Sequence, residues 1–494
     1  MLLFWPLVIP FGTAVACILA WRSVRLQRAI SVAGAAALLA ATVAILVQVL
    51  REGPVAAQAG NWPAPFGITL VADVLSGVML VVTGVIAFST LVYGLADASA
   101  SEERNGHHPL SHAMLAGICG AFLTGDIFNM YVWFEVMIIA SFGLLVVGGR
   151  RDQLDGAMKY VGLNLIATLA FLAGVGLLYG TTGTLNMADL HDKLDGRMGE
   201  TPVLASAALL IFAFASKAAL FPLFFWLPAS YHTLSFGSSA LFSGMLTKVG
   251  VYALIRVFTL VYDVEGTPVQ TLLLWSALTT MVVGVLGAAS HMHVRRILSF
   301  HIISQIGYMI LGLAIYTPLG LIGGIFYVIH HIIVKANLFL IAGLMHGCSG
   351  SEDLRRTGGL WRRRPWLGVL FLIPALSLAG MPPLSGFWAK LLILQASLEE
   401  GRFIAAFVVL AVGLLTLFSM SKIWNEGFWK AHPGGEGAVT GRLRLTMLIP
   451  SIALAAITIL IGLQAGPFVD IAITAAEQIL DPTAYITAVM GEPR

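Results

Sequence analysis

Apolar runs of about 20 residues recur along the whole chain, and each is long enough to cross a bilayer core of about 30 Å. Within lipid, the backbone polar groups of such a run must be satisfied inside the segment, which selects the α-helix. We therefore predict an all-α polytopic membrane protein with about fourteen transmembrane helices. The predicted spans cover residues 2–21, 29–49, 68–95, 110–125, 127–149, 157–181, 203–228, 232–260, 269–290, 298–316, 320–346, 366–398, 402–424 and 445–468.

The composition and the missing motifs exclude several classes of function. Charged residues make up only 11% of the 494 residues, whereas a soluble protein carries roughly 25%. The chain has no basic arm that would suggest nucleic acid, and its three cysteines are isolated. It contains no Walker loop, HExxH or GxSxG pattern. We expect no cofactor, no metal site and no nucleic-acid partner, and a stand-alone enzyme is disfavoured.

Lysine and arginine between the spans predict the orientation. Eighteen of them fall in loops after odd-numbered spans, against six in loops after even-numbered spans and the tail, with Arg256 counted among the six. Since cytoplasmic loops carry the excess of positive charge, the odd loops are predicted to be cytoplasmic. Both termini then face the outside. The uncharged start "MLLFWPLVIP" is interpreted as a retained first span.

Four lysines remain, and all four lie inside predicted spans: Lys217, Lys248, Lys335 and Lys390. A charged side chain at the bilayer centre costs about 2.5–3.5 kcal/mol on insertion scales. Lys248 and Lys335 lie roughly 22–24 Å along their helices, too deep for the side chain to reach the interface. Lysine, unlike arginine, releases its proton readily when buried. These residues are therefore candidate proton-transfer groups.

Two further titratable residues accompany the lysines. Glu135 follows Asp126 by nine residues, about 14 Å along a helix, which puts it near the midplane. We predict that it pairs with Lys217, either for transport or as a purely structural ion pair. His331 and Lys335 are spaced i, i+4 and share a helix face, which favours proton exchange between them. The adjacent His330 is interpreted as an ordinary structural histidine.

Prolines interrupt two of the lysine-bearing spans. Pro222 follows Lys217 within "SKAALFP", and Pro382 with Pro383 precedes Lys390 in "MPPLSGFWAK". A proline removes a backbone donor and frees a carbonyl, which a bilayer tolerates only where protein or water satisfies it. Discontinuous helices of this kind surround the midplane sites of transporters. Pro228 is interpreted as marking the cytoplasmic end of its span.

The two broken spans occupy matching positions in a predicted repeat. Spans four to eight and nine to thirteen form five-helix units, and an odd number of spans inverts consecutive units. The broken span is the fourth member of each unit. The predicted divisions are residues 1–109 (helices 1–3), 110–260 (first repeat), 261–430 (second repeat) and 431–494 (helix 14 and tail).

Over nearly its whole length the chain resembles the antiporter-like subunits shared by Mrp-type cation/proton antiporters and respiratory complex I. The resemblance rests on "FNMYVWFEVM", "SKAALFPLFFWLPASYHT", "LFSGMLTKVGVYALIR" and "SFHIISQIGYMI" together with the buried charges. Gln305 stands in "SQIGY" where several complex I homologues carry histidine. This departure puts a span-ten proton relay in doubt and favours the Mrp branch.

The resemblance implies a function and a role for each buried group. It implies a proton-translocating subunit of a multisubunit Na⁺/H⁺ antiporter, driven by the proton-motive force in a bacterial cell membrane. The expected partners are a large A-type subunit, small membrane subunits, protons, Na⁺ and membrane lipid. The implied roles are a modulating ion pair (Glu135, Lys217), central relay groups (Lys248, His331, Lys335) and a terminal group (Lys390).

Two alternatives remain open at this stage. The first is a proton-pumping membrane-arm subunit of complex I or of a membrane-bound hydrogenase, in which electron transfer elsewhere supplies the energy. The second is a structural scaffold subunit whose buried lysines only lock helices together.

Overall fold

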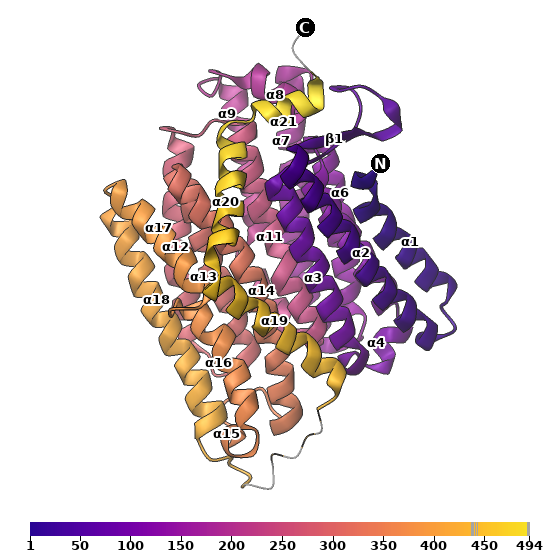
Figure 1. Cartoon of the computed structure of the whole chain (residues 1–494), viewed down its shortest axis with the longest axis vertical. Helices are drawn as coiled ribbons and strands as arrows, with labels where there is room; N and C mark the ends of the chain where they lie inside the picture. Colours follow the sequence, from indigo (N-terminus) through magenta and orange to yellow (C-terminus); the bar gives the residue numbers. More distant parts are fainter. Residues whose placement is uncertain (436–438, 440, 442, 492–494) are drawn as a thin grey trace.

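The computed structural model describes every residue except 436–438, 440, 442 and 492–494. It is a bundle of helices that run along the long axis of the molecule (Figure 1). Within the described residues, twelve helices are long and apolar enough to cross a membrane. They are α1 (Trp5–Leu19), α2 (Val24–Glu52), α3 (Val74–Asp97), α6 (Ile127–Val146), α7 (Arg151–Thr182), α9 (Thr201–Ala218), α11 (Phe236–Leu260), α12 (Pro268–Ser290), α13 (Val294–Ile315), α14 (Pro318–Ser349), α18 (Phe403–Trp424) and α19 (Leu445–Leu463).

Shorter helices complete the predicted set of fourteen spans. The 17-residue α5 (His107–Leu123) lies at predicted span four, and the half-length helices α16 (Pro365–Ala379) and α17 (Ser385–Glu399) together form span twelve. The all-α polytopic fold is therefore confirmed. The remaining helices are α4 (Ala100–Arg104), α8 (Met187–Leu194), α10 (Trp226–Ser230), α15 (Leu360–Arg363), α20 (Ala465–Leu480), α21 (Thr483–Met490), the 3-10 turns η1 (Leu2–Phe4), η2 (Ala59–Asn61) and η3 (Tyr231–Thr233), and the π-helical η4 (Asn425–Trp429).

One antiparallel hairpin follows α2 at the end of the molecule where α21 lies (Figure 1). Its strands are β1 (Val55–Gln58) and β2 (Thr69–Ala72), with Val55 opposite Ala72. Leu70 of β2 forms a bridge with Thr124, and Asp126 forms one with Asn186. The first bridge ties the hairpin to the end of α5, and the second joins the starts of α6 and α8.

The helices that carry the central lysines form the core of the bundle. The apolar spans of α11 and α14 are completely buried, and α13 is nearly so, whereas most of α1, α2, α18 and α19 faces outward. Because lipid tails are as apolar as these side chains, the outward-facing helices can be apolar on every face. The interior helices carry the polar and titratable side chains, which are thereby shielded from lipid.

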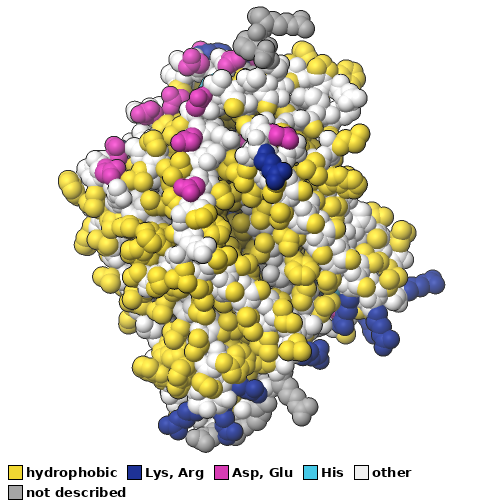
Figure 2. All heavy atoms as spheres, in the orientation of Figure 1, with side chains coloured by type: hydrophobic (Ala, Val, Ile, Leu, Met, Phe, Trp, Pro, Cys, Tyr) yellow, Lys and Arg dark blue, Asp and Glu magenta, His cyan; other side chains and the backbone are white. Residues whose placement is uncertain are grey.

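Charge is distributed unevenly over the outside of the molecule. In the view of Figure 2, hydrophobic side chains cover most of the surface, Lys and Arg gather mainly at the lower end, and Asp and Glu gather toward the upper end. The beginning of α1 and the C-terminal α21 both lie toward the acidic end (Figure 1). An apolar belt between a basic end and an acidic end is the pattern expected of a polytopic protein that obeys the positive-inside rule.

Both predicted helix breaks are present. α9 ends at Ala218, Ala219 adopts a left-handed conformation (φ 61°), and the chain turns helical again only at Trp226. α16 ends at Ala379, Gly380 has φ 92°, and α17 begins at Ser385. Each helix therefore ends at a left-handed residue a few positions before its proline. Pro222 and Pro383 follow cis peptide bonds.

Two details differ from the sequence expectations. Arg256 is not an exposed outer residue: it lies within α11 and is 2% exposed, because Asp73 and the C-terminal helices cover it. Pro228 lies inside α10 and does not end a span. The C-terminal α20 packs its alanine face, including Ala472 and Ala476, against α14 and α3.

A glycine contact between α9 and α11 provides a test of this packing. A Cβ atom at Gly250 would lie 2.6 Å from the backbone nitrogen of Ala218 and 2.9 Å from the carbonyl oxygen of Phe214. We predict that Gly250→Val lowers the free energy of unfolding by about 1–3 kcal/mol through overpacking. The thermal unfolding midpoint of the purified protein measures the change.

The control for this substitution is Gly162→Val in α7, where an added Cβ would meet nothing within 4 Å. It is expected to leave the stability within about 0.5 kcal/mol of wild type, as surface substitutions usually do. Equal midpoints for the two variants would contradict the close α9–α11 approach.

Candidate functional site

The centre of the molecule holds two buried lysines on neighbouring helices. α11 packs against α14, and Lys248 and Lys335 are both 0% exposed. Nζ of Lys248 donates to the Ser243 carbonyl oxygen at 2.5 Å and to Oγ1 of Thr247 at 3.3 Å. Nζ of Lys335 has no hydrogen-bond partner among the residues that the structure describes. A buried polar group of this kind is expected to bind water.

Two histidines accompany these lysines. His331 of α14 and His301 of α13 are fully buried, and neither ring nitrogen of either residue meets a hydrogen-bond partner in the described part of the chain. The charge of Lys335 is close enough to act on both imidazole rings. His331 was predicted from the sequence but His301 was not, although it lies one helical turn before Gln305 in "SFHIISQIGYMI". α13 thus carries a titratable group despite the glutamine, whose Oε1 accepts a hydrogen bond from Tyr327.

The first break lies beside Lys217, the penultimate residue of α9. The indole N–H of Trp226 donates to the Ser216 carbonyl oxygen at 3.0 Å. The N–H of Phe221 donates to Oγ1 of Thr280 on α12 at 2.9 Å. Nζ of Lys217 is buried without a hydrogen-bond partner among the described residues. The backbone groups freed at this break are therefore satisfied by other side chains and not by the lysine.

The expected contact between Glu135 and Lys217 is not formed within the described structure. Glu135, on α6, accepts a hydrogen bond of 2.7 Å from Oγ1 of Thr168 on α7. α6 packs against α7, so the carboxylate turns toward that helix and stays partly exposed on the side of the bundle. Glu135 is nevertheless close enough to act on Lys217 electrostatically. The two charges are neighbours without direct contact.

The second break holds its lysine directly. Nζ of Lys390 donates to the carbonyl oxygens of Leu378 (3.0 Å) and Ala379 (2.9 Å), the last residues of α16. It also lies 5.0 Å from the ring centroid of Tyr308, within the range of a cation–π interaction. An apolar cavity of about 400 Å³ adjoins Lys390 between α17 and α18. Here the freed carbonyls accept hydrogen bonds from the lysine side chain, whereas the sequence predicted only that a break lies beside it.

A buried ion pair that was not predicted from the sequence lies near the other end of α11. Nη2 of Arg256 lies 2.5 Å from Oδ2 of Asp73, the residue that caps α3. The rings of Tyr252 and Tyr485 lie 5.5 Å and 5.3 Å from the guanidinium carbon. The hydroxyl of Tyr252 donates to the carbonyl oxygen of Phe122 at 2.9 Å. The pair joins α3 and α11 to the C-terminal α21.

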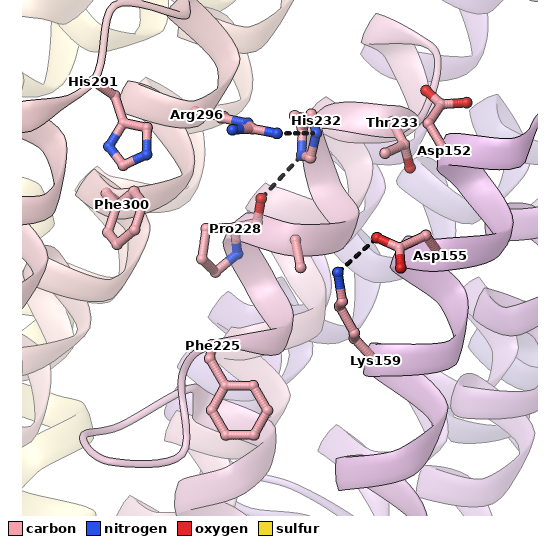
Figure 3. A pocket seen from close by; sticks show the side chains of 11 residues that line it. Asp152, Asp155, Lys159, Phe225, Pro228, His232, Thr233, His291, Arg296 and Phe300 are labelled. Atoms are coloured by element: carbon pink, nitrogen blue, oxygen red, sulfur yellow. Dashed lines mark hydrogen bonds and ion pairs between the residues drawn. The ribbon is translucent and has the colours of Figure 1, made fainter.

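A polar pocket of about 360 Å³ opens beside the first break (Figure 3). Phe225 and Pro228 form one part of its lining, between the Asp155–Lys159 ion pair of α7 and His232 with Arg296 (Figure 3). Nδ1–H of His232 donates to the Pro228 carbonyl at 2.9 Å, which leaves Nε2 to accept from Arg296 at 3.4 Å. Burial, together with the charge of Arg296, lowers the pKa of His232 to about 4.

The selected residues lie on several helices and do not form one hydrogen-bonded cluster among the described residues. Lys217 lies at the first break, Lys248, Lys335 and His331 lie in the core, and Lys390 lies at the second break. Each of these groups can bind and release a proton. Proton exchange between successive groups needs bridging water molecules or polar side chains.

Comparison with known proteins identifies the family. Residues 124–416 match the family described as NADH:quinone oxidoreductase/Mrp antiporter, transmembrane region. The D-type subunit of the Na⁺/H⁺ antiporter of Alkalihalophilus pseudofirmus is 46% identical over 493 residues, covering 99% of both chains. A chain of the Mrp complex from Dietzia sp. DQ12-45-1b superposes with a TM-score of 0.92 at 35% identity, covering 99% of both. A chain of respiratory complex I from Thermus thermophilus has a TM-score of 0.82 at 23% identity over 98% of this chain and 99% of that one, which shows a shared fold.

The buried ion pair yields a stability prediction. Arg256→Gln would leave the carboxylate of Asp73 buried without its counter-charge, which typically costs about 3–5 kcal/mol. Adding Asp73→Asn removes the uncompensated charge and is expected to recover most of that loss. Thermal unfolding of the single and double variants measures both steps, and a double variant no more stable than Arg256→Gln would contradict the account.

His232 yields a prediction on the pH dependence of stability. Because folding lowers its pKa from 6.5 to about 4, the unfolded chain binds a proton in that range that the folded chain does not. The contribution of His232 to stability therefore falls as the pH drops from 6.5 toward 4. The unfolding midpoint of His232→Asn should decline less steeply over this range than that of wild type. Identical slopes would show that His232 contributes nothing.

Proposed function

The chain belongs to the NADH:quinone oxidoreductase/Mrp antiporter family, and on this premise we propose that it is the D-type, proton-conducting subunit of a multisubunit Na⁺/H⁺ antiporter. It is a multi-span membrane protein of the cell membrane and acts as a transporter subunit, not as an enzyme. The proton-motive force drives the exchange. A large A-type subunit and small membrane subunits complete the complex.

The observation that carries this proposal is the hydrogen bonding of the buried lysines. Four lysines lie in the interior, and Nζ of Lys217 and of Lys335 meets no hydrogen-bond partner in the described part of the protein. A lysine that only locked helices together would be held by acceptors, because an unsatisfied buried cation is costly. A group that must gain and lose a proton needs access to water instead. For Lys217 and Lys335 the arrangement therefore favours transport over the scaffold alternative.

Protons would move by hops between titratable side chains and bound water. Lys248, His331 and Lys335 are the proposed central relay, and Lys390 is the terminal group. Pro222, Pro382 and Pro383 lie in the breaks that provide room beside the outer two lysines. The pocket beside the first break is the proposed approach from the cytoplasmic side to Lys217.

Glu135 and Lys217 are proposed to modulate this path. The carboxylate is hydrogen-bonded to Thr168, and the lysine is not in direct contact with it. A pair that opens and closes changes the electrostatic potential at the next group along the line, which drives a proton onward. The separated arrangement supports such a pair, with direct contact formed in the alternate state.

The orientation and the repeat are parts of the same proposal. The basic end of the molecule would face the cytoplasm, so both termini lie on the outer face. Residues 110–260 and 261–430 would be inverted repeats, each with its broken helix as fourth member, flanked by 1–109 and 431–494. The matched positions of the α9–α10 and α16–α17 breaks support this division.

The proposal is tested by Na⁺-dependent ΔpH in everted vesicles that contain the whole complex. Lys217→Ala, Glu135→Ala and Lys390→Ala are each expected to lower antiport by about 100-fold or more, the usual contribution of a positioned proton-transfer group. Native gels of the same membranes report assembly of the complex.

The matched control is Lys193→Ala, which removes an exposed lysine paired with Asp189 on α8. It is expected to keep wild-type antiport. Retained antiport in an assembled Lys390→Ala complex would show that the proton path does not pass through Lys390. Intact antiport in both Lys217→Ala and Glu135→Ala would show that these two residues do not modulate the path.

A further inference from the structure

His330, interpreted from the sequence as a structural histidine, has a hydrogen-bond partner at only one of its ring nitrogens among the described residues. The residue is 0% exposed and lies on α14, next to His331. Its Nδ1 lies 2.8 Å from Oγ of Ser385, the first residue of α17. Its Nε2 is buried and meets no hydrogen-bond partner among the described residues. One nitrogen is thus tied to the second helix break, and the other presents a free acceptor or donor position.

The hydrogen bonds continue from Ser385 into α16. Oγ of Ser385 lies 3.0 Å from Oγ of Ser377, which also accepts a hydrogen bond of 3.2 Å from the N–H of Gly386. Ser377 directly precedes Leu378 and Ala379, whose carbonyl oxygens hold Nζ of Lys390. A continuous series of polar contacts therefore runs from α14 across the break to the residues that bind the terminal lysine.

The backbone is shaped to bring these groups together. A Cβ atom at Gly386 would lie 2.9 Å from Nε2 of His330 and would overlap the carbonyl oxygen of Ser377. Only glycine at this position lets the first turn of α17 approach both α14 and α16 so closely. The ring of Tyr327 stands edge-on to the imidazole, with the ring centroids 5.6 Å apart. Lys390 is close enough to act on His330 electrostatically.

We infer that His330, Ser385 and Ser377 form a proton bridge between the central relay on α14 and Lys390. The inference rests on the proposed function and adds a hydrogen-bonded link between these two parts of it. His330 is the proton-transfer group, and the two serines are its hydrogen-bonded conductors.

The transfer can be written so that every proton is accounted for. Nε2 of His330 accepts a proton as Nδ1–H passes its own to Oγ of Ser385, whose hydroxyl proton moves to Oγ of Ser377. Ser377 releases its hydroxyl proton to a water molecule in the break, and that water protonates neutral Lys390. Both hydroxyls are regenerated, the imidazole has changed tautomer, and a flip of the ring restores the starting form.

The experiment compares Na⁺-dependent ΔpH in everted vesicles holding the whole complex, with assembly checked on native gels. His330→Gln keeps a side chain able to reach Ser385 but cannot be protonated, and Ser385→Ala removes the central hydroxyl. Ser385→Ala is expected to lower antiport by about tenfold, since water replaces the lost hydroxyl only in part, and His330→Gln by about 100-fold, as for the other proton-transfer groups. Ser385→Thr retains the hydroxyl and is expected to restore at least half of the wild-type rate.

The matched control is Ser397→Ala, a buried serine about three turns further along α17 whose hydroxyl donates only to the Ile393 carbonyl at 2.7 Å. It should retain wild-type antiport. Wild-type rates in His330→Gln and Ser385→Ala would overturn the inference, as would equal loss in Ser385→Thr or Ser397→Ala, which would indicate packing alone. A wild-type complex without Na⁺-dependent proton movement would instead overturn the proposed function, and the inference with it.

Discussion

The cost of burying an ammonium group in an apolar interior is the constraint on which the rest of this structure depends. An isolated charge there must be neutralised, paired or bound to polar groups. The chain meets this requirement differently at each lysine. Lys390 binds two carbonyls at the end of α16, Lys248 binds a carbonyl within its own helix, and Lys217 and Lys335 meet no acceptor among the described residues. The first two are held in place, and the second two depend on water or on a moving partner.

A helix break is what allows backbone carbonyl oxygens to bind Lys390. An unbroken helix uses its carbonyls internally, so it has none to offer a side chain in lipid. At the second break, the last carbonyls of α16 are released toward the side chain of Lys390 on α17. Ser377 and Ser385 flank the same gap and join it to His330. One interruption of the backbone thus creates both a lysine site and a hydrogen-bonded route that leads to it.

The sequence predicts the features that are local and periodic. Span positions follow from hydropathy, and both breaks follow from prolines near a buried lysine, so these were confirmed within a few residues. Contacts between helices depend on the direction in which each side chain points. This direction cannot be predicted from the hydropathy pattern of a single sequence. The Glu135 carboxylate was expected on Lys217 but turns to Thr168. Arg256 resembled a residue near a span end because apolar residues follow it only briefly, yet Asp73 and Tyr485 enclose it. His301 and His330 carry no sequence signal that separates them from structural histidines.

The two breaks are alike in position but not in chemistry, and this difference suggests a division of labour. At the first break, the indole N–H of Trp226 donates to the Ser216 carbonyl oxygen, and no backbone carbonyl accepts a hydrogen bond from Lys217 among the described residues. The nearby charge of Glu135 is therefore the main electrostatic partner of Lys217. At the second, the backbone itself holds Lys390. A lysine that depends on a movable carboxylate responds to changes around it, whereas a lysine bound to fixed carbonyls keeps its position. Under the proposed function, this difference would suit the first half to modulation and the second to the terminal proton transfer.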